Sequence, residues 1–160
     1  MHIERQLAAR FHAAASGRGQ QVALSWGLGD EQSSWTYQQL EDRVLALVDE
    51  LRRHDVGRGS VVAIPSARRA EAVAAMLALW ELGAAFVPIA TDDPPARRSR
   101  YVELAGVHAQ LRLDPDGRLL EVRATTRRDV GAPAPRPEEQ IAYVMFTSGS
   151  TGAPAGRRWR

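Results

Sequence analysis

The fold is decided by residues 61–89, which read VVAIPSARRAEAVAAMLALWELGAAFVPI. Two continuous apolar runs of strand length, residues 61–65 and 84–89, flank a helical segment over residues 67–82 that closes on Gly83. A strand, a helix and a second strand in this order form a βαβ unit, whose two strands are parallel and buried on both faces. The sequence therefore predicts an α/β fold with a largely parallel sheet flanked by helices.

Three more elements are expected upstream of this unit. Apolar residues at helical spacing predict a first helix over residues 3–17. The short runs at residues 22–26 and 33–35 are separated by turn residues, which favours a hairpin. Thr36 and Gln39 form the pattern of a capping box, and the apolar residues that follow occupy one face of a second helix.

Downstream of the βαβ unit, two prolines open a further helix that ends by Gly106. Residues 108–113 and 119–122 then flank the turn Asp-Pro-Asp-Gly at 114–117, where glycine supplies the positive φ.

The last third of the chain changes character twice. Residues 124–140 are polar and proline-rich, and we interpret them as an extended surface connector. Residues 141–146 form one more apolar strand, followed at once by a loop rich in serine, threonine and glycine. Because no further element follows residues 143–146, we expect one side of the sheet to stay uncovered and to favour self-association.

Composition excludes several classes of chemistry. The chain has 160 residues, of which 44% are hydrophobic and 25% charged, as in an ordinary globular domain. The absence of cysteine excludes a disulfide framework, a thiolate nucleophile and a cysteine-ligated metal. All 21 basic residues are arginine, so chemistry that requires lysine is excluded as well. The four histidines show no paired ligand spacing, and we expect no metal site.

Charge and hydropathy argue against nucleic acid and membrane as partners. The arginines occur as scattered doublets between acidic residues, which is typical of a solvated surface. The most apolar stretch, residues 72–90, holds Glu81 at its middle and is broken by Gly83 and Pro88. Because a central charge costs about 3 kcal/mol on membrane-insertion scales, this stretch predicts a buried helix and strand. We expect a cytoplasmic protein.

The strongest functional signal is the loop over residues 147–156, which reads TSGSTGAPAG. Its glycines allow backbone N–H groups to curl around an anion, and its hydroxyls add neutral donors, which suits the phosphate chain of ATP. A flexible Ser/Gly turn is the alternative interpretation. A Walker A loop is excluded because there is no lysine, and a nucleophile elbow because Ser150 directly follows Gly149.

Three motifs resemble the signatures of adenylate-forming enzymes, in the order in which that family has them. Residues 35–40 (WTYQQL) resemble L-T-Y-x-E-L, and residues 82–89 (LGAAFVPI) resemble A-G-x-A-Y-V-P-L/I. Residues 143–156 (YVMFTSGSTGAPAG) resemble the phosphate loop Y-x-x-Y-T-S-G-S-T-G-x-P-K-G. The chain is most similar to the N-terminal part of the amino-acid adenylation domains of nonribosomal peptide synthetases, with acyl-CoA ligases as cousins.

The resemblance implies a reaction and a set of binding residues. In that family a carboxylate reacts with ATP to give an acyl-adenylate and pyrophosphate, and the acyl group usually passes to a carrier protein. The loop holds the β- and γ-phosphates of ATP, with magnesium sharing the charge. By motif position the matching residues are Thr147, Ser148, Gly149, Ser150, Thr151 and Gly152.

The chain also departs from the family pattern. Ala155 stands where the loop of the family has lysine, Ala90 stands where an acidic residue is common, and Arg157 follows Ala155 two places later. The later acidic residues, the hinge and the C-terminal domain of the family have no counterpart in this sequence. We therefore expect residues 1–160 to be an N-terminal fragment that is inactive alone, with the rest of the domain encoded downstream of Arg160. The alternative is a non-catalytic interaction or weak nucleotide-binding module.

Overall fold

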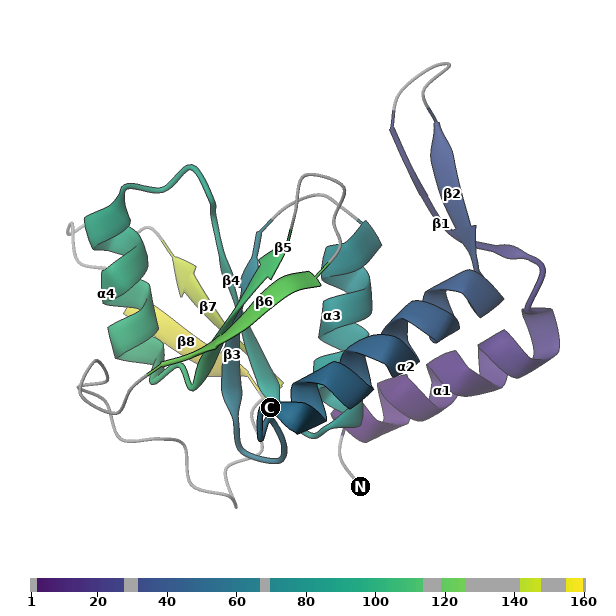
Figure 1. The fold of residues 1–160 in the computed structure, drawn as a ribbon, viewed down its shortest axis with the longest axis horizontal. Helices are drawn as coiled ribbons and strands as arrows, with labels where there is room; N and C mark the ends of the chain where they lie inside the picture. The colour runs from purple at the N-terminus through teal and green to yellow at the C-terminus, as the bar shows by residue number, and fades with distance from the viewer. Residues whose placement is uncertain are drawn as a thin grey trace.

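The computed structural model describes residues 3–27, 32–66, 70–113, 119–125, 142–147 and 155–159. The helices of this part are α1 (Ile3–Arg18), α2 (Tyr37–Arg53), α3 (Ala70–Glu81) and α4 (Pro95–Ala105). Its strands are β1 (Val22–Trp26), β2 (Ser33–Thr36), β3 (Val61–Pro65), β4 (Ala85–Ile89), β5 (Ala109–Leu113), β6 (Leu119–Ala124), β7 (Tyr143–Thr147) and β8 (Ala155–Trp159). Figure 1 shows a central sheet with helices on both sides and the β1–β2 hairpin projecting from the body.

The main sheet has six strands in the order β6-β5-β3-β4-β7-β8. The four central strands are parallel to one another, whereas β6 and β8 pair antiparallel at the two edges. β3 and β4 pair from Val61↔Ala85 to Pro65↔Ile89 without a register shift. The predicted βαβ unit and the largely parallel α/β sheet are therefore confirmed.

The helices divide between the two faces of the sheet. α1, α2 and α3 lie on one side, and α4 lies on the other (Figure 1). Successive residues of a strand point to opposite faces, so β3 contributes to both cores. Val62 and Ile64 belong to the apolar cluster that includes α2 and α3, while Val61 and Ala63 belong to the cluster that includes α4. Both faces of the central strands are thereby buried, which explains the continuous apolar runs in the sequence.

The start of α2 has the predicted capping box. The Thr36 hydroxyl oxygen accepts a hydrogen bond from the Gln39 backbone N–H at 3.2 Å, and the Gln39 side-chain oxygen accepts one from the Thr36 N–H at 2.9 Å. Two backbone donors that a helix start leaves unpaired are thus satisfied. One face of α2 is buried, and its residues recur at helical spacing: Leu40, Val44, Val48 and Leu51.

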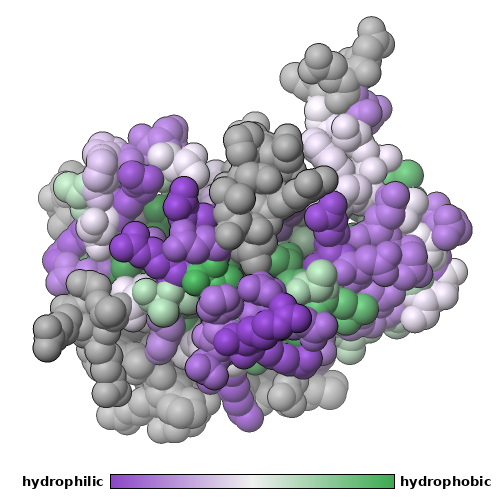
Figure 2. Space-filling view, viewed as in Figure 1, coloured by the Kyte–Doolittle hydropathy of each residue, from purple (hydrophilic) through white to green (hydrophobic). Residues whose placement is uncertain are grey.

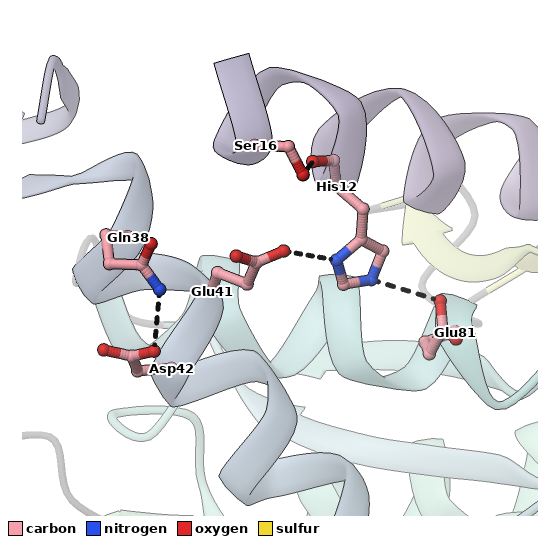
Figure 3. Close-up of polar contacts among 6 residues, drawn as sticks. All are labelled: His12, Ser16, Gln38, Glu41, Asp42 and Glu81. Atoms are coloured by element: carbon pink, nitrogen blue, oxygen red, sulfur yellow. Dashed lines mark hydrogen bonds and ion pairs between the residues drawn. The ribbon is translucent and has the colours of Figure 1, made fainter. Parts of the chain in front are cut away.

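One histidine joins the three helices of the larger core. His12 on α1 places Nδ1 2.8 Å from Glu41 Oε1 on α2 and Nε2 3.4 Å from Glu81 Oε2 on α3 (Figure 3). Ser16, one turn further along α1, donates its hydroxyl to the His12 backbone oxygen at 3.0 Å. The sequence analysis did not identify this contact, because the two acidic partners lie 29 and 69 positions away in the chain.

Two expectations about the last third of the chain were wrong in detail. β7 is not left at an edge: residues 155–159, expected to form no element, make β8 and pair with β7 from Thr147↔Ala155 to Tyr143↔Trp159. The proposed connector does not begin at residue 124, which belongs to β6, and the backbone N–H of Thr125 still donates to the His108 oxygen at 2.8 Å. Residues 126–140 lie outside the described part.

The two faces of β7 differ in exposure. On β7, Val144 is buried but Met145 remains 48% exposed. Self-association through this face stays a prediction. Within the described ranges, no helix is both long enough and apolar enough to cross a membrane.

Candidate functional site

The carboxyl ends of the parallel strands β3, β4 and β7 meet at one edge of the sheet, and the predicted phosphate loop begins there. Thr147 is the last residue of β7 and pairs with Ala155, the first residue of β8. The intervening residues therefore connect two paired strands. Of the six predicted binding residues the structure describes Thr147, and the others, Ser148, Gly149, Ser150, Thr151 and Gly152, lie outside the described residues.

The chain connections make this edge a favourable place for a ligand. The connection from β3 to β4 runs through α3 on one face, and the connection from β4 to β5 runs through α4 on the other face. In open α/β sheets, ligands bind in the crevice outside the carboxyl ends of strands whose connections leave in opposite directions. The Ser66 backbone N–H donates to the Ile89 oxygen at 2.8 Å, so the ends of β3 and β4 are held together at this point.

Aromatic side chains hold β7 on both faces of the sheet. Phe86 of β4 stacks on Tyr143 with ring centroids 5.7 Å apart. Trp80 of α3 lies 5.6 Å from the Phe86 ring and donates its indole N–H to the Ala142 backbone oxygen at 3.2 Å. On the opposite face, Tyr101 of α4 stacks on Phe146 at 4.4 Å. These contacts fix the strand from which the loop departs.

The sequence analysis did not assign a positioning role to these aromatic residues. Its only signal was that bulky rings occur at a few positions among aliphatic core residues. Their partners come from different elements, so the contacts become visible only once the strand order is known.

Ala155 and Arg157 follow the loop closely in the sequence. Ala155 is uncharged, and Arg157 pairs with Met145, two positions further along β8. Among the described residues, no three His, Cys, Asp or Glu side chains lie close enough together to hold a metal ion.

His108 lies at the other end of the sheet, where β3 and β5 begin. Its Nδ1 accepts a hydrogen bond from the Val61 backbone N–H at 3.0 Å. Burial lowers the pKa of His108 below its ordinary value of 6.5. The imidazole is therefore mainly neutral at pH 7, and its position at the amino end of β3 separates it from the predicted phosphate loop.

The fold and the position of the loop define an α/β protein with a candidate ligand site at the carboxyl edge of its sheet. The chain belongs to the AMP-binding enzyme family, whose model matches residues 11–157. The resemblance to adenylate-forming enzymes is thereby confirmed over most of the chain.

Relatives in this family include large synthetases. Phenyloxazoline synthase MbtB of Mycolicibacterium paratuberculosis is 34% identical over 156 residues, which cover 92% of this chain and 13% of the relative. Pyochelin synthetase PchE of Pseudomonas aeruginosa is 36% identical over 123 residues, which cover 74% of this chain and 9% of the relative. The chain thus spans only a small part of the length of these relatives.

Solved structures share the fold. The N-terminal subdomain of NpsA of Klebsiella oxytoca superposes with a TM-score of 0.72 at 24% identity, covering 95% of this chain and 41% of that chain. A fatty acyl-adenylate ligase of L. pneumophila, solved with acyl adenylate and pyrophosphate, has a TM-score of 0.72 at 20% identity, covering 95% and 30%. An artificially fused NpsA-ThdA adenylation-PCP di-domain, also of Klebsiella oxytoca, has a TM-score of 0.71 at 24% identity, covering 95% and 32%.

Proposed function

We propose that residues 1–160 are the N-terminal part of an amino-acid adenylation domain and that the loop beginning at Thr147 binds the β- and γ-phosphates of ATP. The observation that carries this proposal is the position of Thr147, at the end of β7 and beside the carboxyl ends of the central strands. The family match over residues 11–157 supports it.

In the complete domain, one carboxylate oxygen of an amino acid attacks the α-phosphorus of ATP. The bond between the α-phosphorus and its bridging oxygen breaks, and pyrophosphate leaves. The thiol of a carrier protein then attacks the acyl carbon of the acyl-adenylate, a thioester forms, and AMP and the thiol proton are released. The loop holds the departing phosphates: the hydroxyls of Thr147, Ser148, Ser150 and Thr151 and the backbone N–H groups around the glycines donate hydrogen bonds to them.

The chain alone is proposed to bind ATP weakly and not to form the adenylate. Neutral donors position an anion but compensate little of its charge, and Ala155 adds none. The described residues do not fit a magnesium site, and magnesium would be held by the phosphates themselves. Catalysis of this kind depends on positioning and charge stabilisation around the reacting phosphorus, which the neutral donors of the phosphate loop supply only in part.

Exchange of labelled pyrophosphate into ATP tests this proposal. With ATP, magnesium and a mixture of amino acids, the 160-residue chain is expected to show no more exchange than the variant that combines Ser150→Ala and Thr151→Ala. Amino-acid-dependent exchange that exceeds the variant would show that the chain is catalytically complete and would contradict the proposal. ATP affinity below one micromolar would instead favour the alternative, a dedicated nucleotide-binding module.

A further inference from the structure

A groove of about 880 Å³ lies on the face of the sheet that α4 covers. α4 forms one wall, β5 and the edge strand β6 form the other, and the ends of β3 and β4 close it. Its volume is within the range of small-molecule sites. None of the lining residues in the described part of the chain comes from β7 or β8, and the groove reaches the carboxyl ends of β3 and β4.

Arginines line both walls of the groove. Arg100 on α4 pairs with Glu103 at 2.9 Å, and Arg112 on β5 pairs with Glu121 at 3.1 Å, so these two charges are compensated. Arg98 on α4 and Arg123 on β6 also line the groove, and the guanidinium group of neither has a hydrogen bond or an ion pair with another described residue. Two uncompensated guanidinium groups therefore belong to facing walls of one cavity.

A hydroxyl and an apolar floor complete the groove. Oγ1 of Thr125 is buried without a hydrogen-bond partner among the described residues, and Thr125 lines the groove just beyond β6. Buried polar atoms normally have a partner, so an oxyanion in the groove would satisfy this one. The floor includes the buried side chains of Ala63, Ile89 and Val102, which belong to the apolar cluster on this face. In Figure 2, hydrophilic residues cover the region of α4 and the sheet beside it, and hydrophobic atoms are visible between them.

We propose that this groove binds an organic oxyanion: a carboxylate or phosphate group that pairs with Arg98 and Arg123, attached to an apolar body that lies on the floor. Guanidinium groups suit this role because their planar donors match the paired oxygens of carboxylates and phosphates. The apolar body follows from the aliphatic floor, which a hydrated inorganic anion would leave in contact with water. The groove is argued from residues outside the phosphate loop and does not depend on the proposed function.

Titration followed by amide NMR tests the proposal, with benzoate and phenyl phosphate as probes for the two kinds of head group. Either probe is expected to give saturable shifts at Ser99, Leu111 and Thr125, and the one that binds more tightly identifies the head group. Benzyl alcohol has the same ring without the charge and is expected to bind at least about tenfold more weakly. Equal binding of benzyl alcohol, or no saturable shift with either anion, would overturn the proposal.

Variants test the role of the two arginines. Combining Arg98→Gln with Arg123→Gln is expected to raise the Kd of the better probe by about tenfold or more. Arg97→Gln is the matched control, since Arg97 is the neighbour of Arg98, does not line the groove and pairs with Asp93 at 3.2 Å. It is expected to leave the Kd unchanged. An equal loss in the control would show that the anion responds only to the net charge of α4.

A salt titration of the unmodified chain gives an independent readout. Raising NaCl from about 20 to about 200 mM shortens the Debye length to below 10 Å, and it is expected to weaken binding of either anion but not of benzyl alcohol. Anion affinity that does not respond to salt would contradict pairing with the guanidinium groups.

Discussion

The centre of the sheet and its β7–β8 end are built in different ways. β3 and β4 pair along their whole length and are buried on both faces, with Val61, Val62 and Val87 excluded from solvent. β7 pairs with β4 in register at Phe86↔Tyr143 and exposes 48% of Met145. The centre of the sheet is thus held by strand pairing and aliphatic packing, whereas β7 is held by its pairing with β8 and by aromatic contacts to β4 and α4. The proposed phosphate loop follows this second kind of strand.

The largest expected effect is a difference in the free energy of unfolding between two substitutions, one in each region. Ile64 on β3 is 1% exposed, so Ile64→Ala removes buried methyl groups and leaves a cavity, which is expected to lower the free energy of unfolding by about 3 kcal/mol. Met145→Ala on β7 is expected to change it by about 0.5 kcal/mol or less. Urea unfolding of the two variants measures both. Equal losses would mean that β7 belongs to the central core.

The next effect concerns the aromatic contact between α4 and β7. Tyr101 and Phe146 stack with ring centroids 4.4 Å apart and an interplanar angle of 18°. In a double-mutant cycle with Tyr101→Leu and Phe146→Leu, we expect a coupling free energy of about 1 kcal/mol. Strictly additive losses would show that the rings are neighbours by burial alone and do not hold β7.

A smaller effect is expected at the polar contact of the three helices. His12→Gln removes the ring that contacts both Glu41 and Glu81 and is expected to lower the free energy of unfolding by about 1 kcal/mol or less, as for other partly exposed ion pairs. The control is His54→Gln. The His54 ring is exposed at the end of α2 and contacts only Glu50 within the described residues. No measurable effect is expected there. If the two variants behave alike, His12 does not fasten α1 to the other helices.

The smallest effect is a pH dependence at the amino end of β3. Because burial lowers the pKa of His108 in the folded chain, the unfolded chain takes up this proton more readily. The contribution of neutral His108 to stability is complete above about pH 6.5 and is lost as the pH falls towards the lowered value. Much of the side chain is exposed, so the loss is small. Comparison of unfolding curves for the parent and His108→Asn measures it, and identical pH profiles would contradict it.

The central scaffold was predictable because it depends on local signals. The capping box of α2, the βαβ unit, the helix that ends at Gly106 and the β5–β6 hairpin each follow from turn residues and apolar periodicity within one stretch of sequence. β8 was not predictable, since its Arg157 and Arg158 lack the apolar alternation of a strand and the segment forms through backbone pairing with β7. Such pairing has no signature in the side chains.

The candidate site was predictable only in part. The composition of the loop after residue 146 pointed to phosphate binding, and the structure brings the start of that loop to the sheet edge where ligands bind. The groove beside α4 was not predictable, because Arg98 and Arg123 lie 25 positions apart in the sequence and on different elements.

The central claim is that the loop between β7 and β8 holds the phosphates of ATP. The most direct test is a titration with ATP and magnesium in which NMR monitors the amide signals of Thr147 and Ala155. The account predicts saturable shifts at both residues, with a Kd above one micromolar. It also predicts that the shifts disappear when Ser150→Ala and Thr151→Ala are combined and persist in the control Ser34→Ala on the exposed hairpin strand β2. The claim would be contradicted if the shifts persisted in the double variant, or if the unmodified chain showed no shifts at millimolar ATP.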